Sequence, residues 1–376
     1  MLIITGKKGN KMSRKSKSLI TKITKSHAGY TRRSVLAGSA AAATLLATPN
    51  IISAKDAGKV YVRTSGGSYQ DALQAGTWNK FTELTGIEVV PVPANTAKLL
   101  AMVESGAGGL DVAEANATAI VTLHSKGALD KLDTSNFEYT DVADLSIATD
   151  FYLDYATFAE AMCYNTDTYS EKHPTNWKEF WDVDTFPGSR MLQDAKAIAP
   201  NLEFALLADG VSVEDLYPLD IDRAFAKLLE IKPHVVKFFD SGALGASLLA
   251  EGTAVLGSLW TNRVLALKKD GAPVDIEWNQ NMRLHEYSAV LKNAPNRDNA
   301  LRLIDYATSA AAQAATLPVI GLSPANIKAF DFIEASVAAT LPGSPENKPK
   351  GFDSDAGWWL QNRDAVAERW QEFLLA

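Results

Sequence analysis

The chain has 376 residues, 47% of them hydrophobic, a formal net charge of −7 and one cysteine, Cys163. Ten of its 37 basic residues, and none of its 44 acidic ones, lie in residues 1–54, so residues 55–376 carry a net charge of −17. Such an acidic chain is a poor partner for nucleic acid or an anionic membrane surface, and a lone cysteine excludes an intramolecular disulfide. Residues 55–376 suffice for two packed lobes.

The N-terminal segment has the pattern of an export signal. A basic stretch is followed by an Ala-rich apolar run at 35–47 and by the small pair Ser53-Ala54. The run is shorter than the roughly 20 residues that span a bilayer. Thr31-Arg32-Arg33-Ser34-Val35-Leu36 resembles the twin-arginine motif, with Val35 in place of the usual Phe; ordinary secretion is the alternative. We predict that residues 1–54 form a twin-arginine signal, removed to leave a soluble periplasmic protein.

Strands and helices alternate in the predicted first half of the remaining chain. Ser68, after the turn that contains Gly66 and Gly67, is a suitable helix N-cap, and Gly86 suits a left-handed C-terminal cap. In order, the expected elements are a strand at 59–64, a helix at 68–84, a strand at 87–92, a helix at 96–105 and a strand at 110–113. This order predicts a parallel sheet covered on both faces.

The second half follows the same pattern. Asp220 or Asp222 can cap a helix that must end before Pro233. The later elements are strands at 235–239, 254–259 and 274–278 and helices at 241–251, 262–269, 298–309 and 358–375. The fold class is therefore α/β.

Motifs of catalysis and metal binding are not found in the sequence. It has no nucleophile elbow, phosphate-binding loop or dinucleotide-binding glycine motif. The four histidines after residue 54 are scattered and none has a metal-type partner at ligand spacing: His124, His173, His234 and His285. We expect no metal, no cofactor and no enzyme, with a secreted carboxylate-dependent hydrolase or lyase as the alternative.

An ordered set of short motifs resembles the spermidine/putrescine-binding family of ABC-importer solute receptors over nearly all of residues 57–376. The motifs are Thr64-Ser65-Gly66-Gly67-Ser68-Tyr69, Phe81-x-x-x-Thr85-Gly86-Ile87-x-Val89, Gly127-Ala128-Leu129-Asp130-x-Leu132-Asp133, Tyr164-Asn165-Thr166-Asp167, Pro174-Thr175-Asn176-Trp177, Tyr217-Pro218-Leu219-Asp220, Gly257-Ser258-Leu259-Trp260-Thr261-Asn262 and Ile320-Gly321-Leu322-Ser323-Pro324-Ala325-Asn326. Each motif is weak alone, but their order is specific.

The resemblance implies a type II periplasmic-binding-protein fold. Two α/β lobes, each a mostly parallel sheet flanked by helices, would be joined by crossing strands and would close on a ligand between them. The first crossing would end near Tyr164 and the second lie near Tyr287–Leu291. The expected domains are lobe 1 at 55–163 and 287–330, lobe 2 at 164–286, and C-terminal helices at 331–376 that pack on the lobes.

The resemblance also implies a ligand site. Gly67 and Ser68 would bring the backbone close to the ligand, and an aromatic ring such as Tyr69 would flank it. Trp260, at the end of a strand, would cover the ligand, and aromatic faces attract ammonium groups. Polar contacts would come from Glu114, Asn116 and Asp194.

Departures from the family pattern bear on the ligand. The acidic residue expected one helical turn after Asp194 is Ala197. Tyr287 replaces another acid and His285 stands where an aromatic residue is usual, and both are expected to line the site. Fewer acidic contacts disfavour a di- or tri-cationic ligand, because each buried ammonium needs a partner. Arg263 replaces a small residue and suits a carboxylate. These residues favour a monoamine or an amino-acid-like zwitterion over a polyamine.

The resemblance further implies binding without catalysis. Closure of the two lobes would exclude water from the ligand, and the closed form would dock on the transmembrane subunits of an ABC permease. We expect a monomer. The alternative partner is a sensor receptor to which the protein delivers its ligand.

Overall fold

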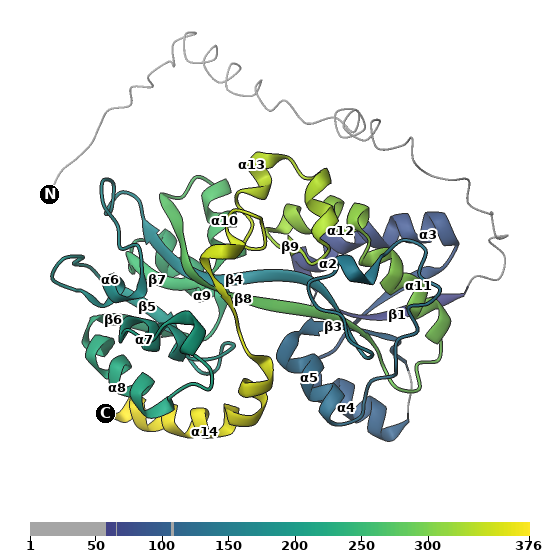
Figure 1. Cartoon of the computed structure of the whole chain (residues 1–376), viewed down its shortest axis with the longest axis horizontal. Helices are drawn as coiled ribbons and strands as arrows, with labels where there is room; N and C mark the ends of the chain where they lie inside the picture. Colours follow the sequence, from purple (N-terminus) through teal and green to yellow (C-terminus); the bar gives the residue numbers. More distant parts are fainter. Residues whose placement is uncertain (1–57, 65, 107–108) are drawn as a thin grey trace, which may run out of the picture. The chain divides into compact units, whose positions relative to one another are not determined.

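The computed structural model describes residues 58–64, 66–106 and 109–376, without the side chain of Ser68 (Figure 1). The predicted export signal at 1–54 lies outside the described residues. Within the described part of the chain, no helix combines the length and apolar character needed to cross a membrane.

All the strands of the described residues belong to one sheet, whose main path has the order β2-β1-β3-β8-β4-β7-β5-β6, with β9 paired to β4 and β10 paired to β8. Their bounds are β1 (Lys59–Thr64), β2 (Glu88–Pro93), β3 (Val112–Asn116), β4 (Leu153–Asn165), β5 (Arg190–Gln193), β6 (Val235–Phe239), β7 (Leu256–Trp260), β8 (Val274–Val290), β9 (Ser323–Pro324) and β10 (Phe352–Asp353). β1 runs parallel to β2 and β3, and β5 runs parallel to β6 and β7. Two parallel groups therefore stand at opposite ends of the sheet.

The long strands β4 and β8 join the two parallel groups, and Figure 1 shows them side by side between the groups. They are antiparallel to each other; β8 also pairs with β3, and β4 also pairs with β7. We call β4 and β8 the crossing strands. The short strand β10 adds to β8 at Met282 and Arg283, so the chain passes this region a third time.

Helices cover the sheet on the side of β1 to β3. They are α2 (Gly67–Leu73), η2 (Gln74–Trp78), α3 (Asn79–Thr85), α4 (Thr96–Ser105) and α5 (Ala117–Ser125). The single helix predicted at 68–84 starts one residue earlier, after Gly66 with φ 78°, and contains the π-helical segment η2. Gly86 ends it in the left-handed conformation, as predicted, with φ 74°.

The group of β5 to β7 carries its own helices: α6 (Trp177–Trp181), α7 (Leu202–Ala208), α8 (Ile221–Ile231), α9 (Gly242–Ala250) and α10 (Thr261–Lys269). Asp220 caps α8, because its Oδ1 accepts a hydrogen bond of 3.0 Å from the backbone N of Arg223. The helix ends at Ile231, two residues before Pro233, as the sequence predicts.

The C-terminal part packs on both groups. It contains α11 (Arg297–Ala307), α12 (Ala310–Thr316), α13 (Ala335–Ala338) and α14 (Ala356–Leu375), with the 3₁₀ segments η6 (Leu317–Ile320), η7 (Ile327–Phe332) and η8 (Lys348–Lys350) between them. Three further 3₁₀ segments lie earlier in the chain: η3 (Val142–Asp144), η4 (Val213–Asp215) and η5 (Lys232–His234). α14 buries Trp359, Val366, Trp370 and Phe373 in the hydrophobic core of α7 and α8. The chain therefore ends on the β5–β7 side.

The predicted lobe boundaries fall on the crossing strands. The boundary at 163/164 lies near the end of β4, and the boundary at 286/287 lies inside β8. The exact division between lobes remains a prediction, because both strands belong equally to the two groups.

Candidate functional site

The two faces of the crossing strands carry different sets of predicted site residues. In the antiparallel register of β3 and β8, Glu114 lies opposite Ser288 and Asn116 lies opposite Glu286. Side chains alternate between faces along a strand, so these four residues share one face. Tyr287 lies opposite Ala115, so it and His285 share the other face. We call the first the carboxylate face and the second the histidine face.

Glu114 and Glu286 form a pair of acids on the carboxylate face. Glu114 is 2% exposed, and its Oε2 has no hydrogen-bond partner among the described residues. Burial, with the charge of Glu286 as a second cause, raises the pKa of Glu114 to about 8. Burial raises the pKa of Glu286 to about 7. Two carboxyl groups in such surroundings are poised to accept a cation.

Arg63, at the end of β1, lies near these acids but is bound to the backbone. Its Nε donates to the carbonyl of Ala94 and its Nη1 to the carbonyl of Glu114, both at 2.8 Å. Its charge lowers the pKa of both acids without reversing the effect of burial. Neither Glu114 nor Glu286 forms an ion pair with any described residue, so both carboxyl groups remain available to a ligand.

Tyr69 brings α2 to the carboxylate face. Its hydroxyl is buried without a hydrogen-bond partner among the described residues. Burial, and then the charge of Glu114, raises the pKa of Tyr69 well above its usual value. The phenol therefore stays neutral beside the acids. A buried hydroxyl that lacks a partner costs free energy, which a polar ligand would recover.

Trp260 comes from the other parallel group, at the end of β7. Its ring meets that of Phe158 on β4 edge-on, with centroids 6.4 Å apart, and its buried Nε1 has no partner among the described residues. Gly242 at the start of α9 makes room for the ring, since a Cβ there would lie 2.5 Å from it. Tyr69 and Trp260 both pack against one hydrophobic cluster that includes Phe158. The structure thus brings aromatic residues of both groups together.

Four other predicted residues lie in helix starts and loops around this face. Gly67 is the exposed first residue of α2, with φ 62°. Asn116 caps α5, its Oδ1 accepting a hydrogen bond of 2.9 Å from Ala119 N. Asp194 follows β5 and accepts one of 2.8 Å from Lys196 N. Arg263 is exposed on the first turn of α10 and makes no hydrogen bond or ion pair with any described residue.

His285 and Tyr287, expected in the ligand site, lie on the histidine face and so do not share a face with Glu114. His285 is 7% exposed; its Nδ1 lies 2.8 Å from Asp154 Oδ2 and its Nε2 lies 3.1 Å from Asp353 Oδ1. Tyr287 stacks on Tyr152 with centroids 4.8 Å apart. The acid on the carboxylate face is the residue between them, Glu286. Because side chains alternate along a strand, a strand predicted over 284–290 would have placed Glu286 on the same face as Ser288. The strand predicted from the sequence ended at Trp278, so Glu286 was missed.

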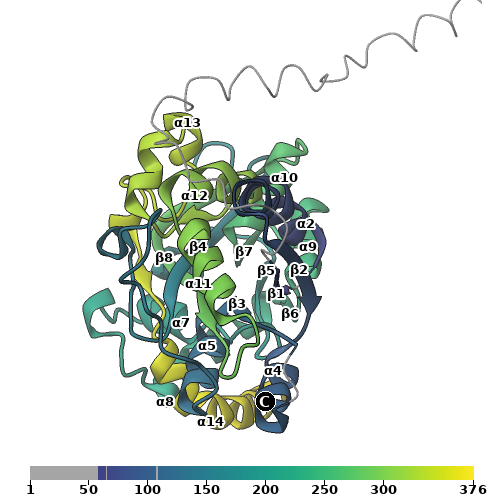
Figure 2. The same ribbon diagram turned by 90° about the vertical axis from the view of Figure 1, so that its right-hand side faces the viewer.

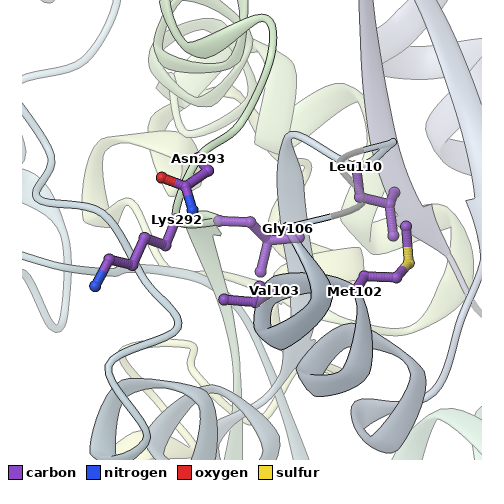
Figure 3. Close-up of a pocket in the computed structure, with 7 residues that line it drawn as sticks. Met102, Val103, Gly106, Leu110, Lys292 and Asn293 are labelled. Atoms are coloured by element: carbon purple, nitrogen blue, oxygen red, sulfur yellow. The ribbon is translucent and has the colours of Figure 1, made fainter.

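Hollows in the described residues near the carboxylate face are small. Two of about 20 and 30 Å³ lie between Leu284, Ile198 and the start of α14, with room for a few water molecules at most. Another of about 10 Å³ lies just past the end of β8, between Met102, Leu110 and Asn293 (Figure 3). The residues around Glu114 are therefore closely packed in this conformation.

Comparisons with known proteins agree with this architecture. The family model for bacterial extracellular solute-binding proteins matches residues 77–342. A gamma-aminobutyric acid-binding protein of Pseudomonas aeruginosa is 31% identical over 312 residues, or 81% of this chain and 87% of that protein. The spermidine/putrescine-binding periplasmic protein of Escherichia coli is 24% identical over 305 residues, or 77% and 86%.

A solved structure of a substrate-binding protein has a similar fold. The ABC transporter substrate-binding protein of Bradyrhizobium japonicum is similar with a TM-score of 0.77 and 32% identity, covering 84% of this chain and 99% of that one. These relatives confirm the two-lobed fold predicted from the sequence, and they are binding proteins rather than enzymes. The chain belongs to the bacterial extracellular solute-binding protein family and is the substrate-binding component of an ABC transporter.

Proposed function

We propose that this protein binds a small ω-amino acid, such as 4-aminobutyrate, between its two lobes and delivers it to the permease. The observation that carries the proposal is the pair of buried Glu114 and half-buried Glu286, which lie beside the unpartnered hydroxyl of Tyr69 and lack an ion pair among the described residues. An ammonium group would satisfy all three side chains. The name of the Pseudomonas relative, a gamma-aminobutyric acid-binding protein, supports this ligand class.

Each end of the ligand has a candidate partner. The ammonium would lie at Glu114 and Glu286, with the rings of Tyr69 and Trp260 against it, since cations are attracted to aromatic faces by about 0.5–2 kcal/mol. The carboxylate would be bound by Arg263, three residues after Trp260 and with no ionic partner among the described residues. Backbone groups near Gly67 and Ser68, and the side chains of Asn116 and Asp194, would complete the site.

Binding would be coupled to closure of the lobes. Tyr69 and Glu114 come from the β1–β3 side and Trp260 and Arg263 from the β5–β7 side, so a ligand that contacts all four favours the closed arrangement. Closure would rotate the lobes relative to each other about the crossing strands, and the permease would bind the closed form. Export, cleavage of residues 1–54 and a monomeric state complete the proposal.

A thermal-shift titration tests the ligand class. A ligand that binds only the folded state stabilises it by about 2.7 kcal/mol at a hundredfold excess over the dissociation constant. We expect 4-aminobutyrate to raise the melting temperature of the purified protein. The shift should be nearly unchanged in Lys269→Ala, a control on the same helix as Arg263. Arg263→Ala and Glu286→Gln should each abolish most of the shift.

Other ligands discriminate the alternatives. Butyrate lacks the ammonium and putrescine lacks the carboxylate, so each should shift the melting temperature less than 4-aminobutyrate. A shift with putrescine or spermidine but none with 4-aminobutyrate would instead assign a polyamine, the ligand class in the name of the Escherichia coli relative. No shift with any of these nitrogenous solutes would refute the amine assignment.

A further inference from the structure

A cavity of about 220 Å³ lies on the histidine face, behind the crossing strands and away from Glu114 and Glu286. Thr157 of β4 and Arg283 and His285 of β8 line one wall, and residues of β9, η7 and η8 line the others. Figure 2 shows α13 and the chain that follows it to the left of β4 and β8, and α2, α9 and α10 to the right. The cavity is several times larger than the hollows near the carboxylate face, and of its lining residues only His285 also borders one of them.

Cationic groups predominate around this cavity. Arg283, His285 and Lys348 line it, against the single carboxylate of Asp353. A second carboxylate, Asp154, lies behind His285 and is hydrogen-bonded to it. Three cations against two carboxylates leave an excess of positive charge when His285 is protonated, and hydrogen bonds to both acids raise the pKa of His285 to about 9 despite burial. Residues 55–376 carry a net charge of −17, so the positive charge of this cavity is opposite in sign to that of the chain as a whole.

Two of these cations keep hydrogen-bond donors for a ligand. Arg283 is 6% exposed; its Nε donates to Asp353 Oδ1 and its Nη1 to the carbonyl of Lys348, both at 2.7 Å. Its Nη2, and the ammonium of Lys348, have no partner among the described residues. A buried guanidinium held by two bonds and left with a free nitrogen is a rigid donor for an anion.

Much of the remaining lining is apolar. It includes Ile147, Pro324, Phe330 and Ile327, of which Ile327 is 52% exposed. An occupant therefore meets both charged groups and hydrocarbon. We propose that this cavity binds a small organic anion, a carboxylate on a short apolar chain, with its charged end at Arg283 and Lys348.

Such an occupant would act on the region where the lobes are joined. It would touch β4, β8 and the segment before β10, which are the three passages of the chain between the parallel groups. The same three are already linked through the bridge from Asp154 to His285 to Asp353. An anion that stiffens them in one arrangement changes the affinity for the main ligand, and the main ligand changes the affinity for the anion by the same factor.

Isothermal titration of the purified protein with pentanoate tests the proposal. We expect saturable one-site binding, and no binding of pentan-1-ol, which has the same chain without the charge. Lys348→Ala should weaken binding about fivefold, whereas Lys350→Ala, on the same short helix but paired with Glu346 and not lining the cavity, should not. Ile327→Trp, a change at an exposed position, should block entry.

The outcome is independent of what the main site binds. Arg263→Ala should leave pentanoate binding intact; binding that is lost in Arg263→Ala but kept in Lys348→Ala would place the probe in the main site and overturn the proposal. Equal binding of pentanoate and pentan-1-ol, or no binding of either, would also overturn it. If pentanoate binds as expected, its presence should change the affinity for 4-aminobutyrate.

Discussion

Glu286 lies close enough to Glu114, across the pairing of β3 with β8, that its charge helps to raise the pKa of Glu114 to about 8. Neither acid has an ion-pair partner among the described residues. This arrangement is unfavourable in the unliganded protein when both groups are ionised. It suits a protein whose ligand supplies the missing positive charge.

The unliganded protein should therefore lose stability as the pH rises. The folded state binds the Glu114 proton up to about pH 8 and the unfolded state only to about 4.5, so the free energy of unfolding falls between these values. Glu114 alone would account for a loss on the order of 3 kcal/mol between pH 4.5 and 7. Urea denaturation of wild type and Glu114→Gln at several pH values measures this. An equally steep pH dependence in both proteins would contradict it.

Binding of an ammonium ligand should release protons near neutral pH. The pKa values of about 8 and 7 mean that Glu114 and Glu286 are partly protonated there, and a cation favours their ionised forms. The affinity should fall roughly tenfold per pH unit below pH 7 for each proton released. Calorimetric titrations in two buffers with different ionisation enthalpies count the protons. Identical heats of binding in both buffers would show that no protons are released on binding and would contradict the prediction.

The bridge from Asp154 through His285 to Asp353 should stabilise the fold most below pH 6.5. A folded-state pKa of about 9 for His285 means that the stabilisation is lost as the pH rises through 9. His285→Gln should lower the free energy of unfolding by about 3 kcal/mol or more, because Asp154 is left buried without its cation. His234→Gln, at an exposed position, is the matched control. Equal stability of the two variants would refute a role for the bridge.

Gly242 should be essential for the position of Trp260. An added Cβ would lie 2.5 Å from the indole ring, so Gly242→Ala must displace the ring or α9, at a cost of about 1–3 kcal/mol. We expect weaker binding of 4-aminobutyrate than in wild type, measured by calorimetry. Ser247→Ala, at an exposed position of the same helix, should bind normally. Normal affinity of Gly242→Ala would remove Trp260 from the proposed site.

Elements bounded by local signals could be predicted from the sequence. The strand at 59–64 and the helix at 96–105 coincide with β1 and α4, and the caps at Asp220 and Gly86 are confirmed. Capping side chains and left-handed glycines act within a few residues, so their positions can be predicted from the local sequence alone. The motif order was also sufficient to identify the family correctly.

The family resemblance placed the two crossings near Tyr164 and Tyr287–Leu291, where β4 and β8 end, but the bounds of these strands could not be read from a local pattern. β4 is buried along its whole length, so it has no alternation of apolar and polar residues. β8 also contains a bulge at Asn279, Gln280 and Asn281, where Gln280 has φ 59° and none of the three residues pairs with β4. Pairing on either side of the bulge, with β4 at Glu277 and with β4 and β10 at Met282, keeps the two halves in one strand.

The sequence by itself determined the α/β class, the family and several of the local elements, because periodicity, caps and motif order are properties of neighbouring residues. Only the tertiary structure decided which acids share a face. Glu114 and Glu286 are 172 positions apart, and the register of β3 on β8 brings them together while it turns His285 and Tyr287 to the opposite side. A shift of one residue in that register would exchange the two faces, since side chains alternate along a strand.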